Sequence, residues 1–415
     1  MTQHRLELAD VFRKHGPEYI KRFGGSLSSE QKRVLRAISV CRTKALGGHR
    51  ERCTQCNFER NAYNSCRNRH CPKCQAAARA AWLDDRAAEL LPVPYFHLVF
   101  TLPKAFRPLA LQNKALIYGI LFKAAWETMQ AIAADPKHLG ARIGMLAVLH
   151  SWSQNLMHHP HLHCVVPGGG LSSDGQRWIY PKKSRNAKKK FFAPVKVLSR
   201  VFRGKFIHHL KRAFRDGEIQ FHGELAGLED PHEFEDFITR TVRTDWIVFC
   251  KRPFGGPQQV LKYLARYTHR VAISNNRLVG MDDERVHFRW KDYAHGNEQK
   301  IMPLSSDEFI RRFLLHVLPA RFVRIRHYGF LSNRTRKEQL ERCRQLLGVK
   351  EDGSEVETKA STESSEDQDK MHRCPKCQEG KMAVVGTLDK ESTETSDPIF
   401  MTLIQMARPA VFDTS

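Results

Sequence analysis

Short runs of consecutive hydrophobic and aromatic residues mark the strands that the sequence predicts in the middle of the chain. Residues 95–102 read YFHLVFTL, residues 143–152 read IGMLAVLHSW and residues 161–166 read HLHCVV. Each run is short and largely apolar, and proline or glycine lies beside it, as is typical of a buried strand. Weaker strand patterns cover residues 241–249, 271–274 and 286–290.

Apolar residues at helical spacing predict most of the other elements. Part of residues 1–46 is expected to be helical, with Ser28 or Ser29 as an N-cap and Gly47-Gly48 as a stop. Further helices are predicted at residues 75–91, 108–134, 195–216, 258–268, 305–318 and 334–347.

The composition changes sharply near residue 350. Residues 351–370 read EDGSEVETKASTESSEDQDK, an acidic and Ser/Thr-rich stretch that is almost free of apolar side chains. Such a segment cannot bury enough surface to offset its ordering entropy, so it is predicted to be a disordered linker.

Charge separates the two sides of this linker. The 415 residues include 68 Lys and Arg and 44 Asp and Glu, a net charge of +24. Residues 351–415 hold 7 basic and 14 acidic residues, so residues 1–350 carry a net charge of +31. An excess of this size indicates a polyanionic partner, most often nucleic acid.

Composition also excludes other classes of protein. With 41% hydrophobic residues the chain is not disordered throughout, and its longest apolar run, residues 115–122, is too short to cross a membrane. The N-terminus has no apolar signal region. We therefore expect a cytoplasmic, nucleoid-associated protein that does not bind membranes.

Clustered cysteines predict a structural zinc ion. Cys53-Thr-Gln-Cys56 and Cys71-Pro-Lys-Cys74 are separated by 14 residues, a spacing at which two C-x-x-C pairs can supply four thiolates to one tetrahedral Zn²⁺. Nearby arginines suit DNA contact: Arg50, Arg52, Arg60, Arg67 and Arg69. The neighbouring Cys41, Cys66, His49 and His70 are expected to pack around the site rather than bind the ion, although they could also hold a second metal ion.

A further pair, Cys374-Pro-Lys-Cys377, has no second pair nearby in the sequence. The sequence leaves open whether it binds zinc or holds two free thiols.

Two histidines in the strand 161–166 form a candidate site for a catalytic metal. Alternate side chains of a strand share a face, so His161 and His163 point the same way while Leu162 points into the core. Two imidazoles so placed can hold a divalent cation and leave positions open for a third ligand and for substrate.

Two tyrosines supply candidate nucleophiles. Tyr263 and Tyr267 are spaced i and i+4 in the predicted helix 258–268 and so share a face, although the same spacing also fits a packing stripe with Val260 and Leu264. A tyrosine hydroxyl can attack a phosphodiester and form a covalent phosphotyrosine. Flanking basic residues would hold a single DNA strand: Lys182, Lys183, Lys188, Lys189, Lys190, Lys262, Arg266 and Arg270.

Four stretches together resemble one known family. RHCPKCQ (69–75), HPHLHCVVPGGGL (159–171), YLARYTHRVAIS (263–274) and RHYGFLSNR (326–334) are similar to motifs of the two-tyrosine HUH transposases of the insertion-sequence-91 family. The resemblance covers about residues 28–350. It implies an α+β fold: an HUH nuclease domain with a central antiparallel sheet flanked by helices, preceded by a helical zinc-binding domain.

The resemblance also implies roles for the candidate residues. His161 and His163 would bind catalytic Mg²⁺ or Mn²⁺, with Gln154 or His150 as a possible third ligand. Tyr263 and Tyr267, on a helix facing the sheet, would attack element ends, become linked to a 5′-phosphate and release a 3′-OH. The partners would be single-stranded element ends, target DNA and host replication factors; the oligomeric state is not implied.

These expectations divide the chain into four parts. Residues 1–91 form a helical zinc-binding, DNA-contacting domain, and residues 92–350 form the nuclease domain. Residues 351–370 form the acidic linker, and residues 371–415 form a small tail with a single C-x-x-C.

Three other functions fit parts of the sequence. A rolling-circle replication initiator or relaxase would share the chemistry. A zinc-dependent DNA-binding regulator would have no catalysis. A metallohydrolase would use the histidine pair and water, and would form no covalent intermediate.

Overall fold

The computed structural model describes residues 5–181, 193–251, 272–293, 295–349, 373–390, 399 and 402, except for the side chains of 77–81, 83, 84 and 251. At its centre is a five-stranded sheet in the order β12-β4-β5-β3-β8, in which every neighbouring pair is antiparallel. The strands are β3 (Tyr95–Thr101), β4 (Gly144–Trp152), β5 (His158–Pro167), β8 (Val248–Lys251) and β12 (Ile325–Gly329). The predicted α+β class and central antiparallel sheet are confirmed.

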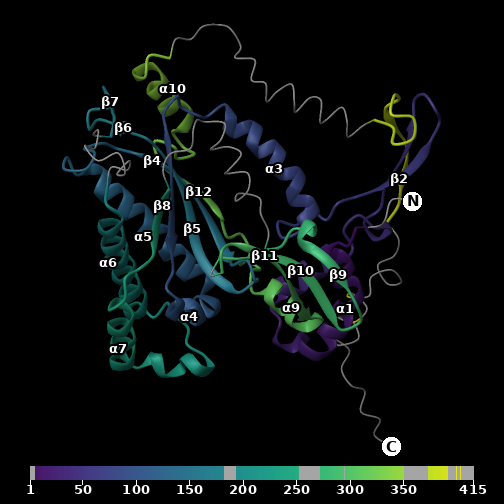
Figure 1. Cartoon of the computed structure of the whole chain (residues 1–415), viewed down its shortest axis with the longest axis horizontal. Helices are drawn as coiled ribbons and strands as arrows, with labels where there is room; N and C mark the ends of the chain where they lie inside the picture. The colour runs from purple at the N-terminus through teal and green to yellow at the C-terminus, as the bar shows by residue number, and fades with distance from the viewer. Residues whose placement is uncertain are drawn as a thin grey trace, which may run out of the picture.

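One face of this sheet packs against two long helices, α5 (Lys114–Ala134) and α6 (Val195–Arg215) (Figure 1). Alternation along the strands puts Phe100 and Leu162 on this face, where both are fully buried. The Phe100 ring lies 5.0 Å from that of Phe202 in α6. The opposite face carries the histidines, so the apolar alternation that anchors the sheet also fixes where they point.

A second layer joins the N-terminal helices to a later part of the chain. Helices α1 (Leu8–Phe23) and α2 (Ser29–Ser39) share a core with α9 (Ser306–Leu314) and the sheet formed by β9 (Leu278–Met281), β10 (Arg285–Asp292) and β11 (Glu298–Ser305). The rings of Phe12 and Phe313 meet edge to face at 5.2 Å. Ser28 caps α2, as predicted, by accepting from the Gln31 amide.

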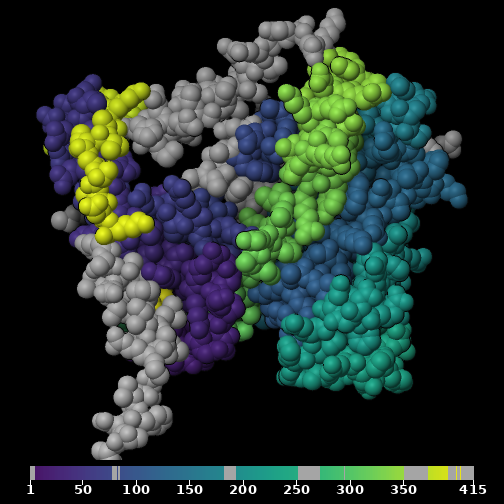
Figure 2. Space-filling view, turned by 180° about the vertical axis from the view of Figure 1, so that it is seen from behind, coloured from purple at the N-terminus to yellow at the C-terminus, as the bar shows by residue number. Residues whose placement is uncertain are grey.

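A third sheet brings the two ends of the chain together. Strands β1 (Gly48–Cys53) and β2 (Glu59–Tyr63) form a hairpin, and β13 (Met382–Leu388) pairs with the other edge of β1. Figure 2 shows this C-terminal segment, in yellow, lying against the N-terminal strands. The sequence analysis predicted none of these strands: β1 and β2 are mostly polar, and the apolar residues of β13 lie beyond the acidic linker, in what was expected to be a small tail.

The remaining elements show where the sequence patterns were incomplete. Strand-like residues 241–249 are corrected: α7 (Pro231–Val242) runs into this range, and β8 starts only at Val248. The expected helix 108–134 is two helices, α4 (Arg107–Gln112) and α5, which separate at Asn113. Residues 272–274, predicted as part of a strand, lie in none. The list is completed by α3 (Pro72–Ala87), β6 (Gly170–Leu171), β7 (Trp178–Ile179) and α10 (Arg336–Leu346).

The predicted helix 258–268 and the acidic linker 351–370 lie outside the described residues. Among the helices that are described, none combines the length and apolar character needed to span a membrane.

Gly329 ends β12 in a backbone conformation that excludes other residues. Its φ is +61°, and a Cβ here would lie 1.8 Å from the carbonyl oxygen of Ile143. We expect Gly329→Ala to lower the free energy of unfolding by on the order of 3 kcal/mol or more, since it adds both strain and a backbone clash. Urea or thermal unfolding measures this.

The matched control is Gly280→Ala in β9. A Cβ at Gly280 meets no atom within 4 Å, so this variant should unfold close to the wild type. Equal stability of the two variants would show that the turn at Gly329 relaxes.

Candidate functional site

Three histidines converge on the face of the central sheet opposite α5 and α6, where His150 and His163 are buried. His150 of β4 lies directly opposite His161 of β5, and His163 is two residues further along β5. One ring nitrogen from each lies within 4.8 Å of the others. The sequence predicted the pair, and of its two candidates for a third ligand the structure brings His150 to them. Gln154 instead donates to the Tyr293 hydroxyl at 3.5 Å.

Hydrogen bonds at Nδ1 orient two of these rings, those of His161 and His163. His161 Nδ1 lies 2.6 Å from the carbonyl oxygen of His159, and so carries the proton. His163 Nδ1 lies 2.9 Å from Nε2 of His97 in β3. Burial lowers the pKa of His161 to about 4, so its ring is neutral at physiological pH. Neutral imidazoles with one nitrogen engaged by the protein are what a metal site needs.

Aromatic and basic groups surround the cluster. The Trp152 ring stacks on His150 at 4.5 Å between centroids. The guanidinium of Arg107, in α4, donates to His159 Nδ1 at 2.6 Å. Its permanent positive charge therefore lies beside His159, two residues before His161 in β5. The sequence analysis missed His97, Arg107 and Trp152. For His97 the signal was available, because it stands in the predicted strand 95–102.

The cysteines form two clusters rather than one. Cys41, Cys66, Cys71 and Cys74 make the first cluster, and Cys53, Cys56, Cys374 and Cys377 make the second. The prediction that Cys53, Cys56, Cys71 and Cys74 share one ion is therefore corrected. The two C-x-x-C pairs therefore belong to different clusters. Cys71 and Cys74 lie beside Cys41, which follows α2, and beside Cys66, which lies in a loop. Both of these residues were expected to pack around the site.

The first cluster fits a structural zinc ion. Sγ of Cys74 lies 3.7 Å from that of Cys41 and 3.6 Å from that of Cys66. Tetrahedral thiolates around Zn²⁺, each about 2.3 Å from it, stand about 3.8 Å apart. Cys41 and Cys71 are buried in the core of the N-terminal helices, so an ion here would stabilise that core directly.

Of the basic residues predicted to contact DNA, the five arginines around the N-terminal cysteines are described, and Arg52 and Arg60 pair with Glu59 and Glu51. Arg67 is exposed. Arg69 is not available, because its guanidinium donates to the carbonyl oxygens of Phe322 and Pro319, both at 2.6 Å. Arg69 therefore docks the N-terminal region onto the chain near residue 320. The others lie outside the described residues, as do both tyrosines: Lys182, Lys183, Lys188, Lys189, Lys190, Lys262, Tyr263, Arg266, Tyr267 and Arg270.

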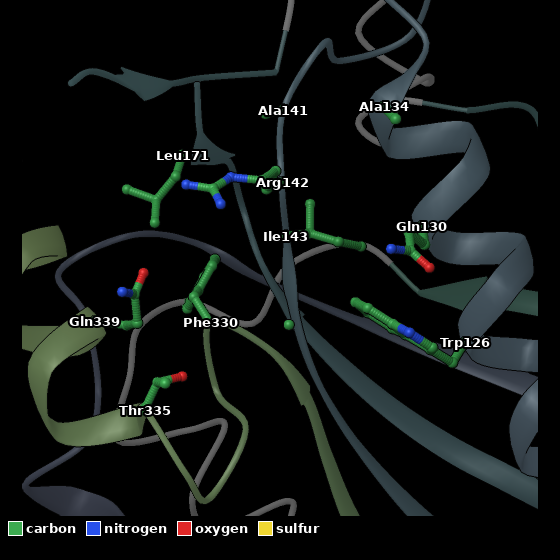
Figure 3. Close-up of a pocket in the computed structure, with 11 residues that line it drawn as sticks. Trp126, Gln130, Ala134, Ala141, Arg142, Ile143, Leu171, Phe330, Thr335 and Gln339 are labelled. Atoms are coloured by element: carbon green, nitrogen blue, oxygen red, sulfur yellow. The ribbon is translucent and has the colours of Figure 1, made fainter. Parts of the chain in front are cut away.

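A pocket of about 390 Å³ opens at the other end of β4. Figure 3 shows Trp126 and Gln130 of α5 on one side of it, and Phe330, Thr335 and Gln339 on the other. Ile143, which lines it, is seven residues from His150, a separation of about 20 Å along a strand. None of the predicted site residues lines this pocket.

A buried histidine beside the cluster makes stability depend on pH. His316 Nε2 donates to the Leu156 carbonyl at 2.9 Å and Nδ1 lies 3.2 Å from Ser151 Oγ. Burial lowers its pKa to about 3. The unfolded chain takes up this proton near pH 6.5, so stability falls as the pH drops from about 6.5 towards 3.

At pH 5 this histidine alone should cost about 2 kcal/mol of unfolding free energy relative to pH 8. Replacing it in His316→Gln keeps a donor and an acceptor but removes the titration. The variant's loss of stability between pH 8 and pH 5, measured by urea unfolding, should be smaller than the wild type's by that amount. Parallel curves for the two proteins would contradict the assignment.

Comparison with known proteins gives matches across the chain. A family model described as "Transposase zinc-binding domain" matches residues 11–102, and one described as "Putative transposase" matches residues 144–339. The chain is 54% identical to "Putative transposase y4qJ" of Sinorhizobium fredii over 394 residues, which cover 94% of this chain and 97% of the relative. It is 25% identical to the "Transposase for insertion sequence element IS801" of Pseudomonas savastanoi pv. phaseolicola, over 78% of this chain and 75% of the relative.

Among solved structures, two complexes of the conjugative relaxase TrwC with oriT DNA are similar over part of the chain. The copper-bound complex matches with 19% identity and a TM-score of 0.24, covering 43% of this chain and 65% of the relaxase. The metal-free complex matches with 18% identity and a TM-score of 0.23, covering 61% and 73%. Similarity of this size does not by itself establish a shared fold.

Proposed function

This chain belongs to the insertion-sequence-91 family of rolling-circle transposases, and from that premise we propose that it cleaves and rejoins single-stranded DNA through covalent 5′-phosphotyrosine intermediates. The observation that carries the proposal is the convergence of His150, His161 and His163 on one face of the central sheet. A protein that used metal only for its structure would not need this histidine site in addition to its cysteine clusters.

The residues of the histidine cluster fit a divalent metal ion. They offer three imidazole nitrogens, and the hydrogen bond from His161 to the His159 carbonyl leaves Nε2 to face an ion. Magnesium prefers oxygen ligands, whereas imidazole suits later transition metals better. We therefore propose Mn²⁺ as the more effective of the two ions predicted from the sequence. When bound, the ion would polarise the non-bridging oxygens of the scissile phosphate.

Residues of the chain would position the DNA around this site. His97 would hold the His163 ring by accepting its Nδ1 proton. Arg107 adds a fixed positive charge beside the cluster, which suits a phosphate. The partly buried Trp152 offers an aromatic face for a base.

The tyrosines are assigned by family resemblance, and the described residues around them support the assignment. Lys251, the last residue before the segment 252–271, pairs in the sheet with His97. Ala272 and Ile273, just after it, belong to the core against which Trp152 packs. Both ends of the segment that contains Tyr263 and Tyr267 are therefore attached near the histidine cluster.

In the proposed reaction, the hydroxyl oxygen of one tyrosine attacks the phosphorus of the scissile phosphodiester. The bond from phosphorus to the 3′-oxygen breaks, the 5′-phosphate stays on the tyrosine, and the 3′-oxygen leaves as a hydroxyl with the proton that the phenol gives up. Attack by a 3′-OH on the phosphotyrosine reverses the step and rejoins DNA. The second tyrosine would serve a second strand.

We also propose that different parts of the chain have different roles. Residues 1–91 contact DNA through exposed basic side chains such as Arg67, and residues 92–350 carry the chemistry. The basic residues 182–190, with Lys262, Arg266 and Arg270, would hold the single strand. Host replication factors would then use the released 3′-OH.

The test is to trap the covalent intermediate. The protein is incubated with labelled single-stranded DNA from a candidate element end and Mn²⁺ or Mg²⁺, then run on a denaturing gel, where a label-carrying protein band is expected. Trypsin cuts after Lys262, Arg266 and Arg270, so Tyr263 and Tyr267 fall on separate tetrapeptides. Mass spectrometry of the digested adduct therefore identifies which tyrosine carries the 5′-phosphate.

The same assay separates the competing functions. Cleavage without an adduct would indicate a metallohydrolase. Binding of a verified element end without cleavage would indicate a regulator. A plasmid initiator or relaxase would form the adduct on an origin sequence and not on element ends.

A further inference from the structure

We propose that Cys53, Cys56, Cys374 and Cys377 bind a second structural zinc ion, which fastens the C-terminal segment to the N-terminal strands. The Sγ atoms of Cys53 and Cys377 lie 3.7 Å apart, and those of Cys56 and Cys374 lie 3.6 Å apart. All four sulfurs lie within 4.8 Å of one another. Such spacing is close to the roughly 3.8 Å expected around tetrahedral zinc, and far longer than the roughly 2.05 Å of a disulfide.

Both C-x-x-C pairs present backbone amides to their sulfurs in the same way. Sγ of Cys53 accepts from the amide of Gln55 at 3.4 Å and from that of Cys56 at 3.5 Å. In the other pair, Sγ of Cys374 accepts from the Lys376 amide at 3.4 Å. Amides pointing at a sulfur favour the thiolate, which is the form that binds metal.

Gly380 independently indicates that the backbone after Cys377 is adapted to lie close to the sulfur of Cys53. A Cβ at this position would lie 2.4 Å from Sγ of Cys53, so the turn after Cys377 reaches the sulfur only because residue 380 is glycine. The Gly380 amide also donates to Sγ of Cys377 at 3.4 Å.

Hydrophobic burial does little to hold β13 in place. Six residues of β13 pair with β1, yet Val384 and Val385 are 63% and 47% exposed. The small core beneath the strand consists of Met382, Cys53 and Cys374, with Phe58 and the other cluster cysteines at its border. So little apolar surface contributes far less to holding the strand than a structural zinc ion would.

The second site is distinct from the one that the family model implies. That model ends at residue 102, whereas Cys374 and Cys377 lie 318 and 324 residues after their partners Cys56 and Cys53. A soft four-thiolate set selects Zn²⁺ over the hard cations. This inference is independent of the proposed DNA chemistry.

Zinc stoichiometry tests the proposal. In a His161→Ala background, which disables the histidine site, full-length protein purified with zinc should contain two ions per chain by elemental mass spectrometry, and the same protein with Cys374→Ser/Cys377→Ser should contain one. The matched control is Cys250→Ser/Cys343→Ser, which removes two cysteines outside both clusters and should keep two ions. One ion in the His161→Ala protein, or two after Cys374→Ser/Cys377→Ser is added to it, would overturn the proposal.

A second measurement does not depend on removing the ligands. A specific protease site replaces part of residues 355–365 in the otherwise complete chain, and the protein is cut there. The C-terminal fragment should co-elute with the rest on gel filtration and separate when a zinc chelator is added. Conversely, a fragment that separates without chelator, or stays bound after both zinc ions are removed, would show that the ion does not hold it.

Discussion

Replacing His161 by alanine is expected to reduce metal-dependent strand cleavage by about 10³-fold or more and to weaken Mn²⁺ binding. The substitution removes one of the three imidazoles that the described part of the chain brings within reach of the proposed ion. It leaves the fold intact, since the His161 side chain faces away from the core that Leu162 enters. Losing a partner of a ligand typically costs about 10- to 100-fold, so losing a ligand should cost more. Titration calorimetry with Mn²⁺ and a cleavage time course measure the two effects.

Two companion variants make this result specific. His287→Ala removes a surface imidazole in β10 that pairs with Asp282, and should bind Mn²⁺ as the wild type does. His97→Gln removes the acceptor beside His163. Its Mn²⁺ affinity should lie between those of the other two variants, about 10- to 100-fold below that of the wild type. If His161→Ala cleaved DNA at the wild-type rate with unchanged dependence on metal, the histidine cluster would not be the catalytic site.

The double substitution Tyr263→Phe and Tyr267→Phe should abolish the covalent adduct and lower cleavage by at least about 10³-fold. Phenylalanine keeps the ring but has no hydroxyl to attack phosphorus, and no alternative route to a protein-bound 5′-phosphate remains. Single-strand affinity should change by less than about threefold, because the charges that hold the DNA backbone are untouched. Adduct gels and fluorescence anisotropy measure the two quantities.

Tyr180→Phe serves as the matched control, because Tyr180 is exposed at 59% and lies far from these positions in the sequence. Each single Tyr→Phe variant should still form an adduct through the remaining tyrosine if the two are interchangeable. An adduct formed by the double variant would exclude both tyrosines as nucleophiles.

Three strands of the central sheet could be predicted because they are nearly continuous apolar runs, whereas β12, with the sequence IRHYG, has no such run and was not predicted. Residues 95–102, 143–152 and 161–166 became β3, β4 and β5 with small shifts at their ends. The direction of His161 and His163 followed from strand alternation alone. His150 could not be assigned with certainty, because its place opposite His161 depends on the register between two strands.

The grouping of the cysteines could not be predicted for the same physical reason. Spacing shows that Cys53/Cys56 and Cys71/Cys74 are knuckles, but only the tertiary fold decides which knuckles meet. Arg69 was likewise misjudged, since an arginine that donates to backbone carbonyls looks the same in sequence as one that binds phosphate. Helix α7 did have a signal: Asp230 caps it and Pro231 opens it.

Because β13 is synthesised long after β1, the sheet that they form can be completed only late in translation. At about 5 to 20 residues per second, roughly 20 to 70 s separate the emergence of Cys53 from that of Cys377. The hairpin of β1 and β2 must wait that long, on the nascent chain, for its third strand. A gene copy cut short before codon 374 would therefore yield a polypeptide that retains every predicted catalytic residue but has an open edge on β1, a target for quality-control proteases.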